Sequence, residues 1–170
     1  SSINHLRLLN NGLSVAGMRS MVPFLQNSNK LTSLYLEGNN IQSEGFNVLF
    51  RALRDSSIEL LSCITNGIES IEIDIDRIPR NLKALDLDDN RINADGCRGL
   101  VRLLQGGDSA LKYIWLNDNR IDDEGVAILV DALKSNTSLK ELILKGNDIS
   151  MDGETLLLKL VNDVSSIRAT

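Results

Sequence analysis

Apolar residues recur along the chain at one fixed spacing. Leu31, Leu34, Leu36, Asn39 and Ile41 follow the pattern L-x-x-L-x-L-x-x-N-x-I, and further copies begin at residues 3, 58, 82, 111 and 139. Successive copies start 28, 27, 24, 29 and 28 residues apart. The alternation of apolar and polar positions in each copy predicts a short strand that buries one face. Strands this short need partners, and connections of about 20 residues favour parallel pairing between successive copies.

An asparagine occupies the same position after every predicted strand. A short amide side chain carries both a donor and an acceptor, so it can satisfy backbone groups that a buried turn leaves unpaired. We therefore expect these asparagines to form a ladder in which each one supports the turn of a neighbouring coil. The six residues are Asn11, Asn39, Asn66, Asn90, Asn119 and Asn147.

A helix is predicted after each asparagine turn. Good N-cap residues stand at the expected start in four copies, as Ser14, Asn93, Asp122 and Ser150. A glycine follows three residues after this position in five copies, which predicts close backbone approach there, since glycine inside a helix is otherwise unfavourable by about 1 kcal/mol. These glycines are Gly17, Gly45, Gly96, Gly125 and Gly153.

The third copy departs from this pattern. It is 24 residues long and carries Glu72 where the other copies have glycine. Isoleucine stands at every second position from Ile71 to Ile75, which is a strand period, and β-branched residues favour extended backbone. We expect an irregular segment here and no regular helix. Residues 68–79 then form either a degenerate repeat that still packs, or an exposed β edge used in self-association.

The pattern L-x-x-L-x-L-x-x-N-x-I-x-x-x-G, with its period of about 28 residues, resembles the ribonuclease-inhibitor-type leucine-rich repeat. That subclass also occurs in NOD-like receptors and in the Ran GTPase-activating protein. The resemblance covers residues 3 to about 163. It implies an α/β fold in which residues 1–170 form one right-handed solenoid domain of six repeats, with a parallel concave sheet and convex helices. No capping segment precedes residue 3 and the last helix is expected to run almost to Thr170, so we expect a fragment of a longer solenoid or association through uncapped ends.

Composition narrows the classes of partner. The chain has 29 leucines and 17 asparagines among 170 residues, with a net charge of −5 and a pI near 4.9. Nucleic acid is bound mainly through clustered cations, so we expect no nucleic-acid partner. The longest apolar runs are far below the ~20 residues that span a bilayer, and no leader pattern opens the chain, so we expect no membrane partner. Two cysteines form no disulfide framework, which favours a cytoplasmic location.

Candidate chemistry is sparse. His5 has no recognisable catalytic partner, Cys63 takes the place of a core leucine, and Cys97 is either core filling or a thiol at a helix start. Asp86, Asp88 and Asn90 open a stretch that lacks the glycine and glutamate of a calcium loop at the required positions. Neither a phosphate-binding loop nor zinc spacing occurs. We therefore predict no catalytic residue, no metal and no cofactor.

The positions that the core does not use vary most between copies, and they lie on the concave face. Tyr113 and Trp115 are expected to project together there, with Tyr35 three strands away; the aromatics are either partner anchors or incidental. Lys83, Lys112 and Lys140 would form a cationic edge opposite acidic residues. We predict a non-catalytic module that binds a protein or peptide. The resemblance adds two alternatives: a GTPase-activating protein of the Ran-regulator type, or a ligand-sensing segment of a NOD-like receptor. The predicted contact residues are Tyr35, Glu37, Asp86, Asp88, Lys112, Tyr113, Trp115 and Asp118.

Overall fold

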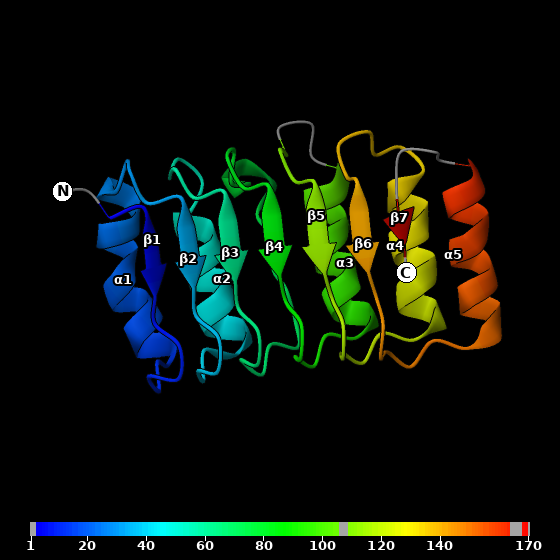
Figure 1. Cartoon of the computed structure of the whole chain (residues 1–170), viewed down its shortest axis with the longest axis horizontal. Helices are drawn as coiled ribbons and strands as arrows, with labels where there is room; N and C mark the ends of the chain where they lie inside the picture. The colour runs from blue at the N-terminus through cyan, green and yellow to red at the C-terminus, as the bar shows by residue number, and fades with distance from the viewer. Residues whose placement is uncertain (1–2, 106–108, 164–167, 170) are drawn as a thin grey trace.

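The computed structural model describes residues 3–105, 109–163 and 168–169. Its strands form one seven-stranded sheet in which each strand pairs in parallel with the next one along the chain (Figure 1). The strands are β1 (His5–Arg7), β2 (Ser33–Tyr35), β3 (Leu60–Ser62), β4 (Ala84–Asp86), β5 (Tyr113–Trp115), β6 (Glu141–Ile143) and β7 (Arg168–Ala169). Leu34 pairs with Leu6 on one side and Leu61 on the other, so equivalent positions of successive copies stand side by side. The predicted parallel stack is confirmed.

All the α-helices of the described chain cover one face of this sheet (Figure 1). They are α1 (Val15–Asn27), α2 (Gln42–Ala52), α3 (Ala94–Gln105), α4 (Asp123–Leu133) and α5 (Met151–Asp163). We call the helix-covered face of the sheet convex and the opposite face concave. Side chains on the concave face are therefore displayed on strands and not overlaid by helices.

The core lies between the sheet and the helices. The middle residue of each inner strand is fully buried, and the helices bury apolar residues at helical spacing against it, such as Leu100 and Leu103 of α3. Burial of one such side chain contributes roughly 1.5–3 kcal/mol. The buried strand residues are Leu34, Leu61, Leu85, Ile114 and Leu142. Each coil completes its core only with its neighbours, as expected for a solenoid.

The repeat asparagines bridge consecutive coils. Asn90 Oδ1 accepts hydrogen bonds from the backbone N–H groups of Asn66 and Ile68 in the preceding coil, at 3.1 and 3.0 Å. Its Nδ2 donates to the carbonyl of Cys63 in that coil and to the carbonyl of Leu87 in its own. The same two-coil arrangement recurs at Asn39, Asn66, Asn119 and Asn147, whereas Asn11 is exposed and donates to Leu9 of its own coil. Each bridging amide thus fixes a turn to the turn before it.

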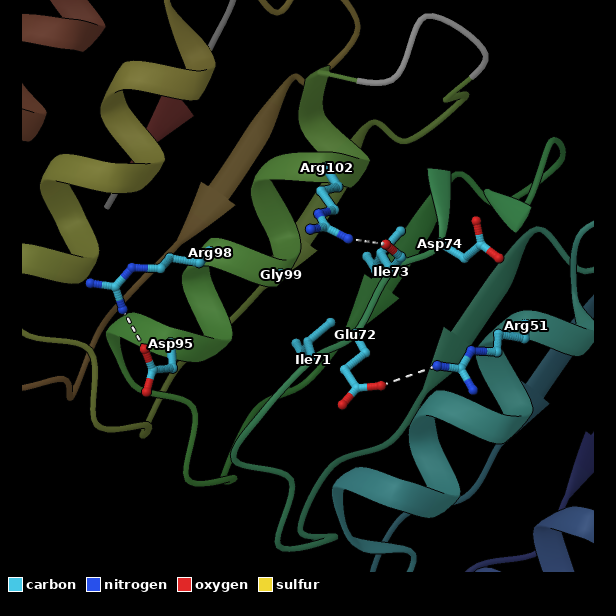
Figure 2. Close-up of a pocket in the computed structure, with 9 residues that line it drawn as sticks. All are labelled: Arg51, Ile71, Glu72, Ile73, Asp74, Asp95, Arg98, Gly99 and Arg102. Atoms are coloured by element: carbon cyan, nitrogen blue, oxygen red, sulfur yellow. Dashed lines mark hydrogen bonds and ion pairs between the residues drawn. The ribbon is translucent and has the colours of Figure 1, made fainter. Parts of the chain in front are cut away.

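The third coil has no α-helix, which confirms the predicted irregular segment. Residues 68–74 form neither a helix nor a strand and lead, as an extended segment, into the short 3₁₀ helix η1 (Ile75–Arg77) (Figure 2). Ile71 and Ile73 are buried, while Ile75 is 65% exposed, so only the first two isoleucines of the alternation enter the core.

Helices α2 and α3 hold the backbone of this extended segment. Asn47 Oδ1 accepts from the N–H of Glu72 at 3.0 Å, and Arg102 Nη1 donates to the carbonyl of Ile73 at 3.2 Å. Gly99 of α3 lies so close to the carbonyl of Ile71 that a Cβ atom there would overlap it. The edges of the segment therefore face the two helices and not open solvent.

The C-terminal end differs from the expectation. The last helix ends at Asp163, and residues 168–169 pair as β7 with β6, so the predicted helix running almost to Thr170 is wrong. Three of the four predicted N-caps are confirmed: the side chains of Asn93, Asp122 and Ser150 accept from the N–H groups of Gly96, Gly125 and Asp152. The fourth, Ser14, makes no side-chain capping hydrogen bond.

Candidate interaction surfaces

The register of the sheet places four concave-face residues in one row. Tyr35 pairs with Ser62, Ser62 with Asp86, and Asp86 with Trp115. Neighbouring strands stand about 4.8 Å apart, so the two aromatic residues are about 14 Å apart with two small side chains between them. We call Tyr35, Glu37, Ser62, Asp86 and Trp115 the central concave patch.

An aromatic side chain stands at each end of this patch. The rings of Tyr113 and Trp115 are stacked, with centroids 6.2 Å apart and planes 20° apart. Trp115 Nε1 donates to Glu141 Oε1 at 2.9 Å, which fixes the indole on the sheet. At the other end the guanidinium of Arg7 lies 4.8 Å from the centroid of the Tyr35 ring. Both rings therefore stand in defined orientations before any partner arrives.

Three carboxylates, those of Glu37, Asp86 and Asp88, lie near one another on this face. Glu37 Oε1 accepts from Ser62 Oγ at 2.8 Å, but Glu37 Oε2 is buried and accepts from nothing among the described residues. Asp88 accepts from the backbone N–H and the side-chain amide of Asn117, at 2.7 and 3.0 Å. Asp86 Oδ1 accepts from the N–H of Asp88 at 3.2 Å. Within the described part of the chain, none of the three carboxylates is in an ion pair with a lysine, arginine or histidine.

Burial changes the acidity of this cluster. Desolvation raises the pKa of Asp86 from 3.8 to about 6; the N–H of Asp88 opposes the rise, and the negative charges of Asp88 and Glu37 add to it. Cys63 is fully buried in the core, and burial, followed by the charges of Glu37 and Asp86, raises the pKa of its thiol far above the ordinary value. A partly buried carboxylate that resists ionisation, on an exposed face, is typical of a functional site.

The remaining predicted contact residues lie around the patch. Lys112 directly precedes β5 and is half-buried, whereas Asp118 is exposed in the turn after it. Of the predicted cationic edge, Lys83 is in an ion pair with Glu59 at 2.8 Å. Ser62, Arg7 and Glu141 were not predicted as contact residues from the sequence, although they occupy the same repeat columns as predicted ones. Those columns are the signal that could have found them.

The convex side carries a separate cleft where the third coil lacks its helix (Figure 2). Its volume is about 380 Å³, and the buried isoleucines of the extended segment form its floor between α2 and α3. Arg51 is in an ion pair with Glu72 at 3.1 Å, and Arg98 points from α3 to Glu124 of α4. The lining residues are Arg51, Ile71, Glu72, Ile73, Asp74, Asp95, Arg98, Gly99 and Arg102. The lining contains three arginines and three carboxylates, so it carries no net charge.

Metal ligation and membrane insertion find no support in the described part of the chain. It contains no group of three or more His, Cys, Asp or Glu side chains arranged to hold a metal ion. No helix among the described residues is both long and apolar enough to cross a membrane.

Comparison with known proteins supports the repeat assignment. A family model described as "Leucine Rich repeat" matches residues 27–46, 79–101 and 135–153, which overlap the starts of the second, fourth and sixth copies. Protein CARMIL of Dictyostelium discoideum is 28% identical over 141 residues, covering 80% of this chain and 13% of that protein. The chain thus spans about an eighth of the length of this relative.

A solved structure shares the fold at low sequence identity. Leiomodin-1 Actin-Binding Site 2 (ABS2) aligns with 94% of this chain and 79% of its own, with a TM-score of 0.56 and 13% identity. At this level of identity the likeness concerns the fold alone.

Proposed function

We propose, since this chain is a leucine-rich-repeat protein, that it acts as a non-catalytic interaction module whose concave face binds a partner protein. The observation that carries the proposal is that the aromatic residues with a polar group gather on that face. The chain has only six aromatic residues, and both tyrosines and its one tryptophan lie on the concave face. Tyrosine and tryptophan are enriched among residues that dominate binding energy.

The three phenylalanines lie away from the concave face, and Phe24 of α1 is 51% exposed. Phe46 and Phe50 are buried in the core at 5.4 Å from each other, where they stabilise the fold. Tyr113 is 36% exposed and Trp115 is half-buried, so both retain surface for a partner. Their stacked, hydrogen-bonded arrangement reduces the side-chain entropy that binding would otherwise remove.

Actin is the first purified partner to test. The leiomodin-1 structure is named for an actin-binding site, and its chain has this fold. Because the likeness concerns the fold alone, actin is one candidate partner, and capture of proteins from cell extract tests for others. Co-sedimentation with actin filaments, and titration with monomeric actin, measure this binding directly.

The test compares a concave variant with a convex one. Wild-type chain, Trp115→Ala and Arg19→Ala are each immobilised and used to capture proteins from cell extract; Arg19 is an exposed convex residue paired with Glu44. We expect Trp115→Ala to weaken capture of a specific partner about 30-fold, the effect of losing about 2 kcal/mol at an interface anchor. Arg19→Ala should bind as wild type does. Loss of binding in Arg19→Ala with full binding in Trp115→Ala would move the interface to the convex side and contradict the proposal.

A further inference from the structure

We propose that the central concave patch receives an arginine side chain of the partner, with its guanidinium between Tyr35 and Trp115 and its donors on Glu37 and Asp86. This inference rests on the proposed concave-face function and specifies the chemistry that the partner must present. It is carried by three separate features of the patch: an unsatisfied buried acceptor, a gap between two rings, and uncompensated negative charge.

The first feature is Glu37 Oε2, a buried acceptor without a donor in the described structure. Ser62 holds the other oxygen of the same carboxylate, so the group is fixed in place with one oxygen unsatisfied. Buried acceptors are almost always hydrogen-bonded, and an unpaired one costs about 1–3 kcal/mol. Because this oxygen is buried in the unbound chain, a partner's N–H group reaches it only if the carboxylate turns towards the concave surface, and that donor would then remove the cost.

The second feature is the shape of the row. Ser62 and Asp86 are the only residues between Tyr35 and Trp115 at this register, and both are small. The two ring-bearing strand positions are about 14 Å apart, and a flat group of the partner would lie above the two small side chains between them. The Arg7 guanidinium already lies against the Tyr35 ring at 4.8 Å, so a cation next to an aromatic ring is compatible with this surface.

The third feature is charge. Glu37, Asp86 and Asp88 are near one another, and no cationic side chain of the described chain forms an ion pair with them. Asp88 is occupied by Asn117, whereas Glu37 Oε2 and Asp86 Oδ2 accept no hydrogen bond from the described residues. A negative or neutral partner group would leave this repulsion in place, whereas a cation removes it.

Arginine fits these features better than lysine does. Its planar guanidinium carries five donors in a fixed fork, so it can donate to two carboxylates at once while a face lies against a ring. An ammonium group is a compact point charge and cannot use both the ring faces and two acceptors in the same way. The patch should therefore discriminate between the two cations.

Intrinsic fluorescence gives a direct test because Trp115 is the only tryptophan of the chain. The probe is a blocked pentapeptide of glycine with one central arginine, titrated against the whole chain. Two matched peptides carry lysine or citrulline, the neutral isostere of arginine, at the same position. We expect a saturable change with a dissociation constant on the order of 1 mM for arginine, about fivefold weaker binding for lysine and about tenfold weaker binding for citrulline.

Isosteric variants assign the signal to the patch. Glu37→Gln and Asp86→Asn should each weaken binding of the arginine peptide by about fivefold, because each removes one charged acceptor. Glu154→Gln removes the same charge from an exposed position on α5 and should bind as wild type does. Thermal melting of each variant confirms that it is folded.

Several outcomes would overturn the inference. If the citrulline or lysine peptide bound as tightly as the arginine peptide, the patch would not recognise a guanidinium. If Glu37→Gln and Asp86→Asn both bound the arginine peptide as wild type does, the binding site would not be the central concave patch. A protein partner that Trp115→Ala loses but Asp86→Asn retains would overturn the arginine inference while leaving the concave interface intact. A partner that both variants retain would overturn the proposed function itself.

Discussion

Asp86→Asn should stabilise the protein while it weakens binding. Burial holds the pKa of Asp86 at about 6 against an ordinary value of 3.8, so the folded state disfavours the ionised carboxylate. Asparagine has the same shape, carries no charge, and can still accept the N–H of Asp88 through Oδ1. The substitution therefore removes an unfavourable charge without removing the hydrogen bond that orients the side chain.

The size of the effect follows from the pKa shift and its sign. A group whose folded pKa lies above its unfolded pKa loses stability as the pH rises through that interval. Below pH 3.8 the penalty is absent, and above about pH 6 it is complete. The full shift corresponds to about 3 kcal/mol, but the carboxylate retains contact with solvent, so screening reduces the expected gain to about 1–2 kcal/mol.

Denaturant unfolding at two pH values measures this gain. At pH 7.5 the Asp86→Asn variant should exceed wild type by about 1–2 kcal/mol, equivalent to about 4 °C in melting temperature for a chain of this size. At pH 4.5 the difference should shrink to about one third of that value, because the unfolded chain is already largely ionised there and the folded chain is not. Glu154→Gln controls for the change in net charge and should stay within about 0.5 kcal/mol of wild type. A less stable Asp86→Asn variant at pH 7.5, or a gain that does not change with pH, would refute the reasoning.

Three further predictions concern the fold. Asn90→Ala should lower the free energy of unfolding by about 2–3 kcal/mol because it leaves buried backbone groups unpaired, whereas Trp115→Ala should lower it by less than about 1 kcal/mol. Melting curves of the two variants test this, and a larger loss of stability in Trp115→Ala than in Asn90→Ala would contradict the assigned structural and binding roles. Gly99→Ala should destabilise by about 2 kcal/mol or more, since its Cβ would overlap the carbonyl of Ile71; unfolding at wild-type denaturant concentration would show that α3 can shift. Burial raises the pKa of the Cys97 thiol to about 12, so iodoacetamide should label it only as the protein unfolds; rapid labelling of the native state would contradict its burial.

The sequence predicted the parts of the fold that repeat. Leu34 and its equivalents could be assigned to the core because one register recurs six times, and Glu72 identified the coil that departs from the rule. Gly99 shows the limit of this reasoning: it is not a repeat glycine, and its role depends on the path of an irregular segment from another coil. Periodicity gives no information on such a path, so the convex cleft was not predicted.

The sequence predicted which repeat positions form the candidate site, but it did not predict the contacts between their side chains. Trp115 and Tyr113 could be placed together because alternate residues of a strand share a face. The bond between Ser62 and Glu37 could not be predicted, because it joins two coils through rotamers that the repeat leaves open. The unsatisfied oxygen of Glu37 is a property of that bond, and only the side-chain geometry reveals it.

The absent third helix has a mechanical consequence. Helix α1 packs on α2, and α3 packs on α4, but the extended segment interrupts the helical layer between these two groups (Figure 2). The sheet is continuous there, so we expect the solenoid to bend most easily about its third coil, where the layer that resists compression is thinnest. Tyr35 and Trp115 stand on opposite sides of this seam. A small change in the curvature of the solenoid would then increase or decrease the distance between the two rings.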